Sequence, residues 1–320
     1  MRNWRLYQKG GDYSPYYFDI HLVADWDADR QTYRGFHGRP GRPTERPSNY
    51  QYFFRPGLSW PLRTQRGLAL RVLPSSCIFS HKGPTVFVDN NNADDLLALL
   101  AIANSLLFRQ LVSLQMTFGS YEVGVIQRTP IPDFTPETAQ CLANLTRWAW
   151  SLKWGLDTAS EASHAFILPT LLQVTGESLS ARSRAWDERV RAADEQLARI
   201  QAEIDECAFN LYGVYNSDRQ NMLETLHHTG EAGEATDNDD EDNEEITQAD
   251  APALVAQLLS YDMGLVFGRF DLDLALGRSS LPPEPDPFAP LPVCPPGQLQ
   301  NEQGLPISRK DVTRLKDERR

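Results

Sequence analysis

The sequence predicts an α+β protein, in which a β-rich N-terminal region precedes a helical region. Residues 1–90 are rich in aromatic and β-branched residues that Gly and Pro interrupt, which is typical of strands and turns. Residues 182–212 repeat apolar residues at alternating spacings of four and three, which is typical of a long helix. We therefore expect a β-rich domain at 1–134, a helical region at 135–228, an insert at 229–250, a C-terminal helix at 251–280 and an extended tail at 281–320.

Several segments of the N-terminal region have the composition of strands. A polar loop rich in Arg, Gly and Pro, residues 31–49, lies between the segments 16–26 and 50–60. A further strand is expected at 121–127, closed by the proline-containing turn that follows it. The strands predicted before it are 16–26, 50–60, 67–74, 77–80 and 85–89.

Capping residues mark the expected starts of two helices. Asn91 or Asn92 precedes an apolar run and can accept the free backbone N–H groups of a first helical turn. Thr135 precedes Pro136, which suits the first position of a helix because its missing N–H is not needed there. A last apolar helix is expected at 252–271.

The long helix at 182–212 has a seam about four heptads long and is expected to end at Gly213. Such a helix packs in a bundle, spaces two globular parts, or forms a dimer contact, and the pattern leaves these interpretations open. The seam residues are Trp186, Val190, Ala193, Leu197, Ile200, Ile204, Cys207 and Leu211.

Two segments near the C-terminus have biased composition. Residues 231–245 hold nine acids in fifteen positions, and a run of this kind cannot bury a core. We therefore expect a disordered acidic insert at 229–250. Residues 281–296 carry eight prolines, which predicts an extended backbone.

The charge is unevenly distributed along the 320 residues. The net charge of −12 by itself argues against nucleic-acid binding, because affinity for phosphate comes from clustered basic side chains. However, residues 1–130 carry 15 Lys+Arg and 10 Asp+Glu, whereas residues 131–320 carry 16 and 33. Residues 30–82 have ten basic residues and one acid, Glu45. The distribution therefore points to a basic front half and an acidic back half.

The sequence shows no catalytic, cofactor or metal motif. It contains no glycine-rich nucleotide loop, no HExxH, no GxSxG and no paired cysteines with zinc-ligand spacing. Cys77 and His81 lie four apart without two further ligands nearby, so we interpret them as a structural pair. The motif [DNS]PP[YFW], which base-methylating enzymes use to hold an adenine, is also absent. We therefore expect no catalytic residue, no cofactor and no metal in this chain.

A cytoplasmic location is expected. No apolar run reaches the roughly 18–20 residues that a membrane span needs, and the first residues have no apolar segment of a secretory signal. The four cysteines are far apart, which fits reduced thiols better than a disulfide framework.

The order of several blocks resembles a known family. The blocks are WRLYQKGGDYSPYYFDIHLVADWD, RPSNYQYFFRPGLSWP, LRVLPSSCIFSHKGPTVFV, SYEVGVIQRTPIPDF, IQAEIDECAFNLYGV and LLSYDMGLVFGRFDLDLALG. Together they are similar to the target-recognition region of large adenine-specific DNA methyltransferases of the type IIG restriction–modification and BREX phage-defence kind. The resemblance implies a DNA target-recognition domain at 1–134 that binds double-stranded DNA.

Fuller members of that family carry an upstream Rossmann-like domain, which binds S-adenosylmethionine and holds the NPPY-type motif. These residues lack that domain, so the resemblance implies recognition without catalysis, and a catalytic domain or subunit as partner. We expect a split, truncated or separately encoded piece. Two alternatives are a protein-interaction module of a defence complex and a non-functional gene fragment.

The resemblance and the basic composition of residues 30–82 together predict the DNA contacts. Arg, Lys and polar side chains on a rigid β scaffold can reach phosphates and base edges. The candidate DNA-binding residues are Lys9, Arg34, Arg39, Arg42, Arg46, Arg55, Arg63, Arg66 and Arg71.

Overall fold

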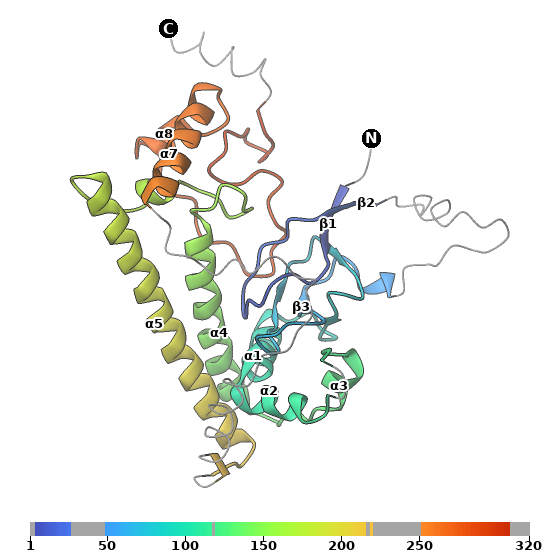
Figure 1. The fold of residues 1–320 in the computed structure, drawn as a ribbon. Helices are drawn as coiled ribbons and strands as arrows, with labels where there is room; N and C mark the ends of the chain where they lie inside the picture. The colour runs from blue at the N-terminus through green and yellow to red at the C-terminus, as the bar shows by residue number, and fades with distance from the viewer. Residues whose placement is uncertain (1–3, 27–48, 117–118, 216–217, 220–250, 308–320) are drawn as a thin grey trace, which may run out of the picture. The chain divides into compact units, whose positions relative to one another are not determined.

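A computed structural model describes residues 4–26, 49–116, 119–215, 218–219 and 251–307 (Figure 1). Short strands come first and helices follow, so the predicted α+β class is confirmed. The described residues form two compact units. The first unit draws on Met1–Arg147, Ile200–Glu241 and Asp286–Pro290, and the second on Trp148–Arg199, Asp242–Pro285 and Leu291–Arg320.

The strands of the first unit form two small sheets. In one sheet, β1 (Trp4–Gln8) lies between β2 (Val23–Asp25), which is antiparallel to it, and β5 (Cys77–Phe79), which is parallel. In the other, β3 (Gly57–Ser59) pairs antiparallel with β4 (Arg71–Leu73) and β6 (Thr85–Val86). The strands are shorter than predicted. In particular, the segment 50–60 begins with a 3-10 turn, η2 (Tyr50–Tyr52), before β3.

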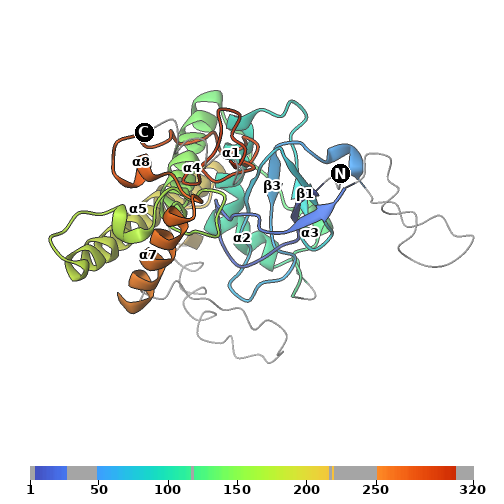
Figure 2. The same ribbon diagram turned by 90° about the horizontal axis from the view of Figure 1, so that it is seen from above.

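Two helices continue the core of the first unit. The views of Figures 1 and 2 place α1 (Ala93–Asn104) and α2 (Leu106–Ser113) next to β3. Asn92 caps α1 as predicted, because its side chain accepts a hydrogen bond from the Asp95 backbone N–H at 3.0 Å. The apolar run that follows Asn92 forms two helices, because the chain breaks at Ser105, and the two helices differ in direction by 63°.

The break at Ser105 has a local cause and a tertiary one. The Ser105 hydroxyl accepts from the Phe108 backbone N–H at 3.3 Å, so Ser105 acts as the N-cap of α2. The buried Asn104 side chain, just before it, bonds both backbone groups of Leu70, at 2.8 Å and 2.9 Å. Asn104, the last residue of α1, therefore joins the end of that helix to the backbone of the segment that leads into β4.

None of the described helices is by itself long and apolar enough to cross a membrane. The bent pair of α1 and α2 passes that test together, by length and composition only. Many of its apolar side chains, Leu96, Leu97 and Leu100 among them, are buried in the protein.

The strand predicted at 121–127 is wrong, because residues Val123–Arg128 form the short helix α3. The backbone of Tyr121 forms hydrogen bonds with a different segment: its N–H donates to Leu62 O at 2.7 Å, and its carbonyl accepts from the Trp60 indole at 2.8 Å. Only Val125 of the helix is buried. The alternation of valines that suggests a strand is therefore not matched by a buried face.

The longer helices match the predicted capping and periodicity. Helix α4 spans Pro136–Asp157, and Thr135 Oγ1 accepts from the Thr138 backbone N–H at 3.3 Å. Helix α5 spans Leu179–Leu211, which confirms the long helix, and Gly213 follows it with φ of 69°. Both helices contribute to both units. The predicted domain boundaries stay predictions.

The second unit has its own core around α7 (Ala251–Val266) and α8 (Leu272–Ala275). The rings of Tyr261 and Phe270 stack at 4.6 Å, and Phe166 packs against both. Helix α7 ends at Val266, earlier than the predicted 271, and Gly268 follows with φ of 71°. The proline-rich segment 281–296 has no helix or strand, as expected. The acidic insert predicted at 229–250 lies outside the described residues.

Candidate nucleic-acid interface

Three glycine- or proline-containing turns of the first unit meet at one place. A Cβ on Gly10, in the turn after β1, would lie 2.8 Å from the Lys82 carbonyl oxygen and 3.8 Å from Pro61 Cα. A Cβ on Gly83 would lie 2.8 Å from the Gly10 backbone nitrogen. The Leu62 backbone N–H also donates to Lys82 O at 3.1 Å. The glycines are needed because the three backbones approach this closely.

A buried arginine supports the first of these turns. Arg71 is 1% exposed, and its guanidinium donates to Gly10 O and, at 2.8 Å, to Asp12 O. The same group lies 4.3 Å from the ring centroid of Phe18. Gln8 adds a second donor, because its Nε2 bonds Gly10 O at 3.2 Å. Arg71 and Gln8 therefore fix the conformation of the turn, because their side chains hydrogen-bond its backbone carbonyls.

Four exposed basic side chains lie in or close to these turns in the sequence: Lys9 and Lys82 beside the contacting glycines, Arg63 two residues after Pro61, and Arg66 in the turn that follows. Within the part of the chain that the structure describes, none of the four is within salt-bridge distance of a carboxylate. Arg63 makes one hydrogen bond, from Nε to Ser120 Oγ at 2.8 Å. We refer to these four residues as the basic patch. Its charges are available to an anionic ligand.

An arginine of helix α2 extends the basic patch. Two guanidinium groups lie over the ring of Tyr13, with Arg66 Cζ at 5.1 Å and Arg109 Cζ at 5.9 Å from its centroid. A Cβ on Gly67, whose φ is 104°, would lie 2.9 Å from the Arg109 side chain. Cations over an aromatic face are held in place without a carboxylate partner. The Tyr13 ring therefore orients Arg66, whose guanidinium has no hydrogen-bond acceptor among the residues that the structure describes.

Arg55, also predicted as a DNA contact, is largely used inside the protein. Its guanidinium donates to Asn91 Oδ1 at 2.7 Å and 2.9 Å and to Val88 O at 2.9 Å. It also lies over the rings of Tyr52 and Phe87, which stack on each other at 5.3 Å. Arg55 is half-buried and holds the turn before α1.

The structure thus sorts the nine predicted residues into four groups, and Arg55, half-buried and bonded inside the protein, forms one of them. Lys9, Arg63 and Arg66 are exposed. Arg71 needs correction: it is a buried structural arginine, because its donors face main-chain carbonyls and not the surface. Lys82 and Arg109 were missed, and the only signal for Lys82 was its place in the basic segment 30–82. Four predicted residues lie outside the described residues: Arg34, Arg39, Arg42 and Arg46.

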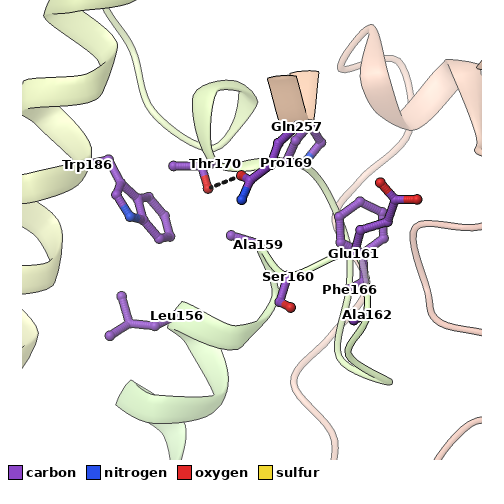
Figure 3. A pocket seen from close by; sticks show the side chains of 10 residues that line it. All are labelled: Leu156, Ala159, Ser160, Glu161, Ala162, Phe166, Pro169, Thr170, Trp186 and Gln257. Carbon is purple, nitrogen blue, oxygen red and sulfur yellow. Dashed lines mark hydrogen bonds between the residues drawn. The ribbon is translucent and has the colours of Figure 1, made fainter. Parts of the chain in front are cut away.

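The second unit has a shallow hollow of about 390 Å³ between α4, α5 and α7 (Figure 3). Apolar side chains such as Leu156 and Trp186 line one side, and a 3.5 Å hydrogen bond joins Thr170 to Gln257. No group of three or more His, Cys, Asp or Glu side chains suited to a metal ion occurs in the described ranges. His81 is exposed and Cys77 is buried, so they do not form a ligand pair. The hollow has no arrangement of reactive groups.

Comparison with known proteins gives two distant relatives. The chain is 21% identical over 282 residues to the adenine-specific methyltransferase PglX of Lacticaseibacillus casei (strain Zhang), and the match covers 85% of the chain and 21% of the relative. It is 21% identical over 273 residues to the adenine-specific methyltransferase BrxX of Escherichia coli O9:H4 (strain HS), which covers 84% and 21%. No protein-family model matches the chain.

The chain spans about a fifth of the length of these curated relatives. It is therefore distantly similar to adenine-specific methyltransferases, over one part of their length. This supports the family that the sequence blocks suggested at the level of a methyltransferase-related role.

Proposed function

We propose that the chain is the target-recognition part of an S-adenosylmethionine-dependent N6-adenine DNA methyltransferase of restriction–modification or phage defence, of the BREX kind. The observation that carries the proposal is the basic patch. Three turns held together by close backbone contacts, and the turn at Arg66 that follows one of them in the sequence, carry four exposed cations that have no carboxylate partner among the described residues. A rigid surface of this kind suits phosphate contacts, which position a protein on a duplex.

Two further observations support DNA as the ligand. Both relatives carry the name adenine-specific methyltransferase, and the match covers 84–85% of this chain. The segment 30–46, which follows β2 in the sequence, adds the arginines at 34, 39, 42 and 46. We propose that base-edge contacts come from these loop arginines and that the basic patch contacts phosphates.

S-adenosylmethionine does not fit the described residues. Such cofactors bind at the carboxyl ends of parallel strands, next to a glycine-rich turn that opens a helix. The described sheets have three short strands each, and β1 and β5 are their only parallel pair. The 320 residues also contain no NPPY-type motif. We therefore propose that a catalytic domain or subunit binds the cofactor and that these residues supply recognition.

A charge-matched pair of variants tests the proposal. Fluorescence anisotropy measures the affinity of the chain for a duplex over a series of salt concentrations. Replacing Arg63 and Arg66 by Ala is expected to lower the affinity and to reduce the slope of log affinity against log salt by about two. The control replaces Arg191 and Arg199, two exposed arginines of α5, by Ala and is expected to leave the slope unchanged.

Binding that ignores both salt and the Arg63/Arg66 substitution would reject the proposal. A second substitution set, Arg39, Arg42 and Arg46 to Ala, separates recognition from general affinity. We expect it to remove the preference for a target sequence, while the basic patch keeps the salt-dependent binding.

A second candidate function, contact with a protein partner, is supported by one face of α7. Three apolar side chains at helical spacing are exposed there, Leu259 (60%), Met263 (56%) and Val266 (71%), and the exposed Phe267 (70%) follows directly after the helix. We propose the methyltransferase catalytic part as the partner, because the relatives are about five times longer than the matched region. Co-purification with a methyltransferase polypeptide should fail for Leu259→Gln with Phe267→Gln and persist for Leu114→Gln, an exposed control.

A further inference from the structure

Phe54 stands out because neither its backbone nor its burial favours a phenylalanine there. It lies in the turn between η2 and β3 with φ of 63°, a region that bulky residues rarely adopt. Phe53 before it has φ of −65° and ψ of 149°, so the pair resembles a type II turn with Phe where Gly or Asn is preferred. The Phe54 ring is nevertheless 40% exposed.

The turn is held in place despite this strain. The Phe54 backbone N–H donates to Cys77 O at 3.0 Å, which ties the turn to β5. The adjacent Phe53 is buried and packs edge-on against Phe79 at 4.8 Å. Phe53 therefore anchors the turn, and the surrounding structure keeps Phe54 in an unfavourable conformation on the surface. Strained residues that the fold maintains in this way are concentrated at functional sites.

The surroundings of Phe54 indicate what it could bind. Arg5, an exposed residue of β1, places its guanidinium 5.8 Å from the Phe54 ring centroid. The ring of Trp26 lies close to that of Phe54, with the centroids 6.1 Å apart and the planes inclined by 76°. A guanidinium group over an exposed ring offers two planar surfaces on which a nucleobase can stack, the guanidinium plane and the ring, and its charge attracts the backbone phosphate.

We propose that Phe54 and Arg5 form a stacking site for one unpaired base of the bound DNA. The proposal rests on the proposed DNA-binding function and deepens it. Bases inside a duplex already stack on each other, so the ligand of a single exposed ring is a base that has left the stack. Strand β1 joins Arg5 to Lys9 of the basic patch, and four residues of strand span roughly 13 Å. The two sites therefore fit one DNA within about four base pairs.

The test compares two 20-base-pair duplexes that differ only by one bulged adenine, which is replaced by 2-aminopurine for a fluorescence signal. The wild-type chain should bind the bulged duplex about fivefold to a hundredfold more tightly than the matched one. Its binding should also quench 2-aminopurine, because the base then stacks on a ring. Phe54→Asn should remove both effects while it leaves binding of the matched duplex unchanged.

A stability measurement separates this role from a structural one. Asn tolerates a positive φ, so Phe54→Asn is expected to leave the melting temperature unchanged or to raise it. Phe54→Trp should keep the preference for the bulged duplex, and Phe267→Asn, which removes an exposed ring elsewhere, should have no effect on it.

Three results would overturn the inference. Equal affinity of the wild-type chain for both duplexes rejects the stacking site and leaves the duplex-binding function standing. Loss of stability together with loss of both affinities in Phe54→Asn shows that the ring is structural. Absence of any DNA binding by the wild-type chain rejects the proposed function and this site together.

Discussion

The Tyr16 hydroxyl donates a hydrogen bond of 2.6 Å to the Gln201 side chain, although the two residues are 185 positions apart. Tyr16 is buried, with φ of 71°, and its backbone bonds Leu70 O and Val72 N on either side of Arg71. Gln201 also donates to Asn104 O at 3.2 Å and to Asp205 at 3.0 Å. Helix α5 is thereby joined to the strand that carries Arg71, which supports the turn of the basic patch.

Removing the Tyr16 hydroxyl should weaken this connection. Tyr16→Phe leaves the Gln201 oxygen without its partner, and we expect a loss of about 1–2 kcal/mol in the free energy of unfolding. Urea unfolding followed by tryptophan fluorescence measures the loss. Tyr13→Phe is the control, because its ring keeps its contacts with the guanidinium groups of Arg66 and Arg109. An equal loss in both variants would contradict a specific role for the Tyr16–Gln201 bond.

Arg71 should not tolerate lysine. A lysine ammonium cannot make the two-pronged contact with Gly10 O and Asp12 O, so Arg71→Lys is expected to cost about 3 kcal/mol of stability. The variant should also weaken DNA binding, because the turn that carries Lys9 loses its support. Thermal unfolding compares the stability of Arg71→Lys with that of the control Arg63→Lys, which changes an exposed arginine. A variant as stable as the wild type would show that Arg71 does not hold the turn.

The pH dependence of stability should carry a contribution from Asp205. Burial raises the pKa of this carboxyl, and bonds from the Leu106 N–H (2.6 Å) and Gln201 oppose the rise without cancelling it. The folded state therefore holds its proton to a higher pH than the unfolded state. Stability contributed by the protonated form is present below the unfolded pKa and is lost as the pH rises through the folded pKa.

Asp205→Asn keeps an acceptor for the Leu106 N–H without the ionisable group. Relative to the wild type, this variant should gain stability as the pH rises from about 4, the unfolded pKa of an aspartate, to neutrality. Urea midpoints of both proteins across that range measure the difference. A difference that is constant with pH would contradict the prediction.

Replacing Gly264 of α7 by alanine should destabilise the protein. A Cβ there would lie 2.2 Å from the Phe270 ring, which stacks on Tyr261 in the core of the second unit. We expect Gly264→Ala to lower stability by about 1–3 kcal/mol, because the ring must move. Gly155→Ala in α4 meets nothing within 4 Å and should stabilise the protein by about 0.5–1 kcal/mol. Differential scanning calorimetry distinguishes the two, and melting temperatures that shift in the same direction would count against this packing.

Much of the helical structure could be predicted because the relevant signals are local. A cap such as Asn92 or Thr135 bonds an N–H three residues away, and the seam of α5 repeats within each turn. The same kind of reasoning failed at 121–127. Alternating valines suggested a strand there, but the backbone of Tyr121 is bonded to Leu62 and Trp60, outside its own segment.

The candidate site could be predicted only in part. Composition marked 30–82 as basic, but it could not distinguish Arg66, which is exposed, from Arg71, which is buried. It also gave no reason to join Lys82 to Lys9. Their proximity follows from close contact between the turns at Gly10 and Gly83.

The sequence by itself determined the α+β class, the starts of α1 and α4, the presence of the long helix α5, and the concentration of positive charge near the N-terminus. These properties depend on residues within a few positions of each other or on composition. Only the tertiary structure decided which cations reach the surface and which turns meet. Burial of Arg71 depends on a carbonyl 61 residues away, and the anchoring of Tyr16 on an amide 185 residues away. Contacts of that range arise from packing, which no local pattern encodes.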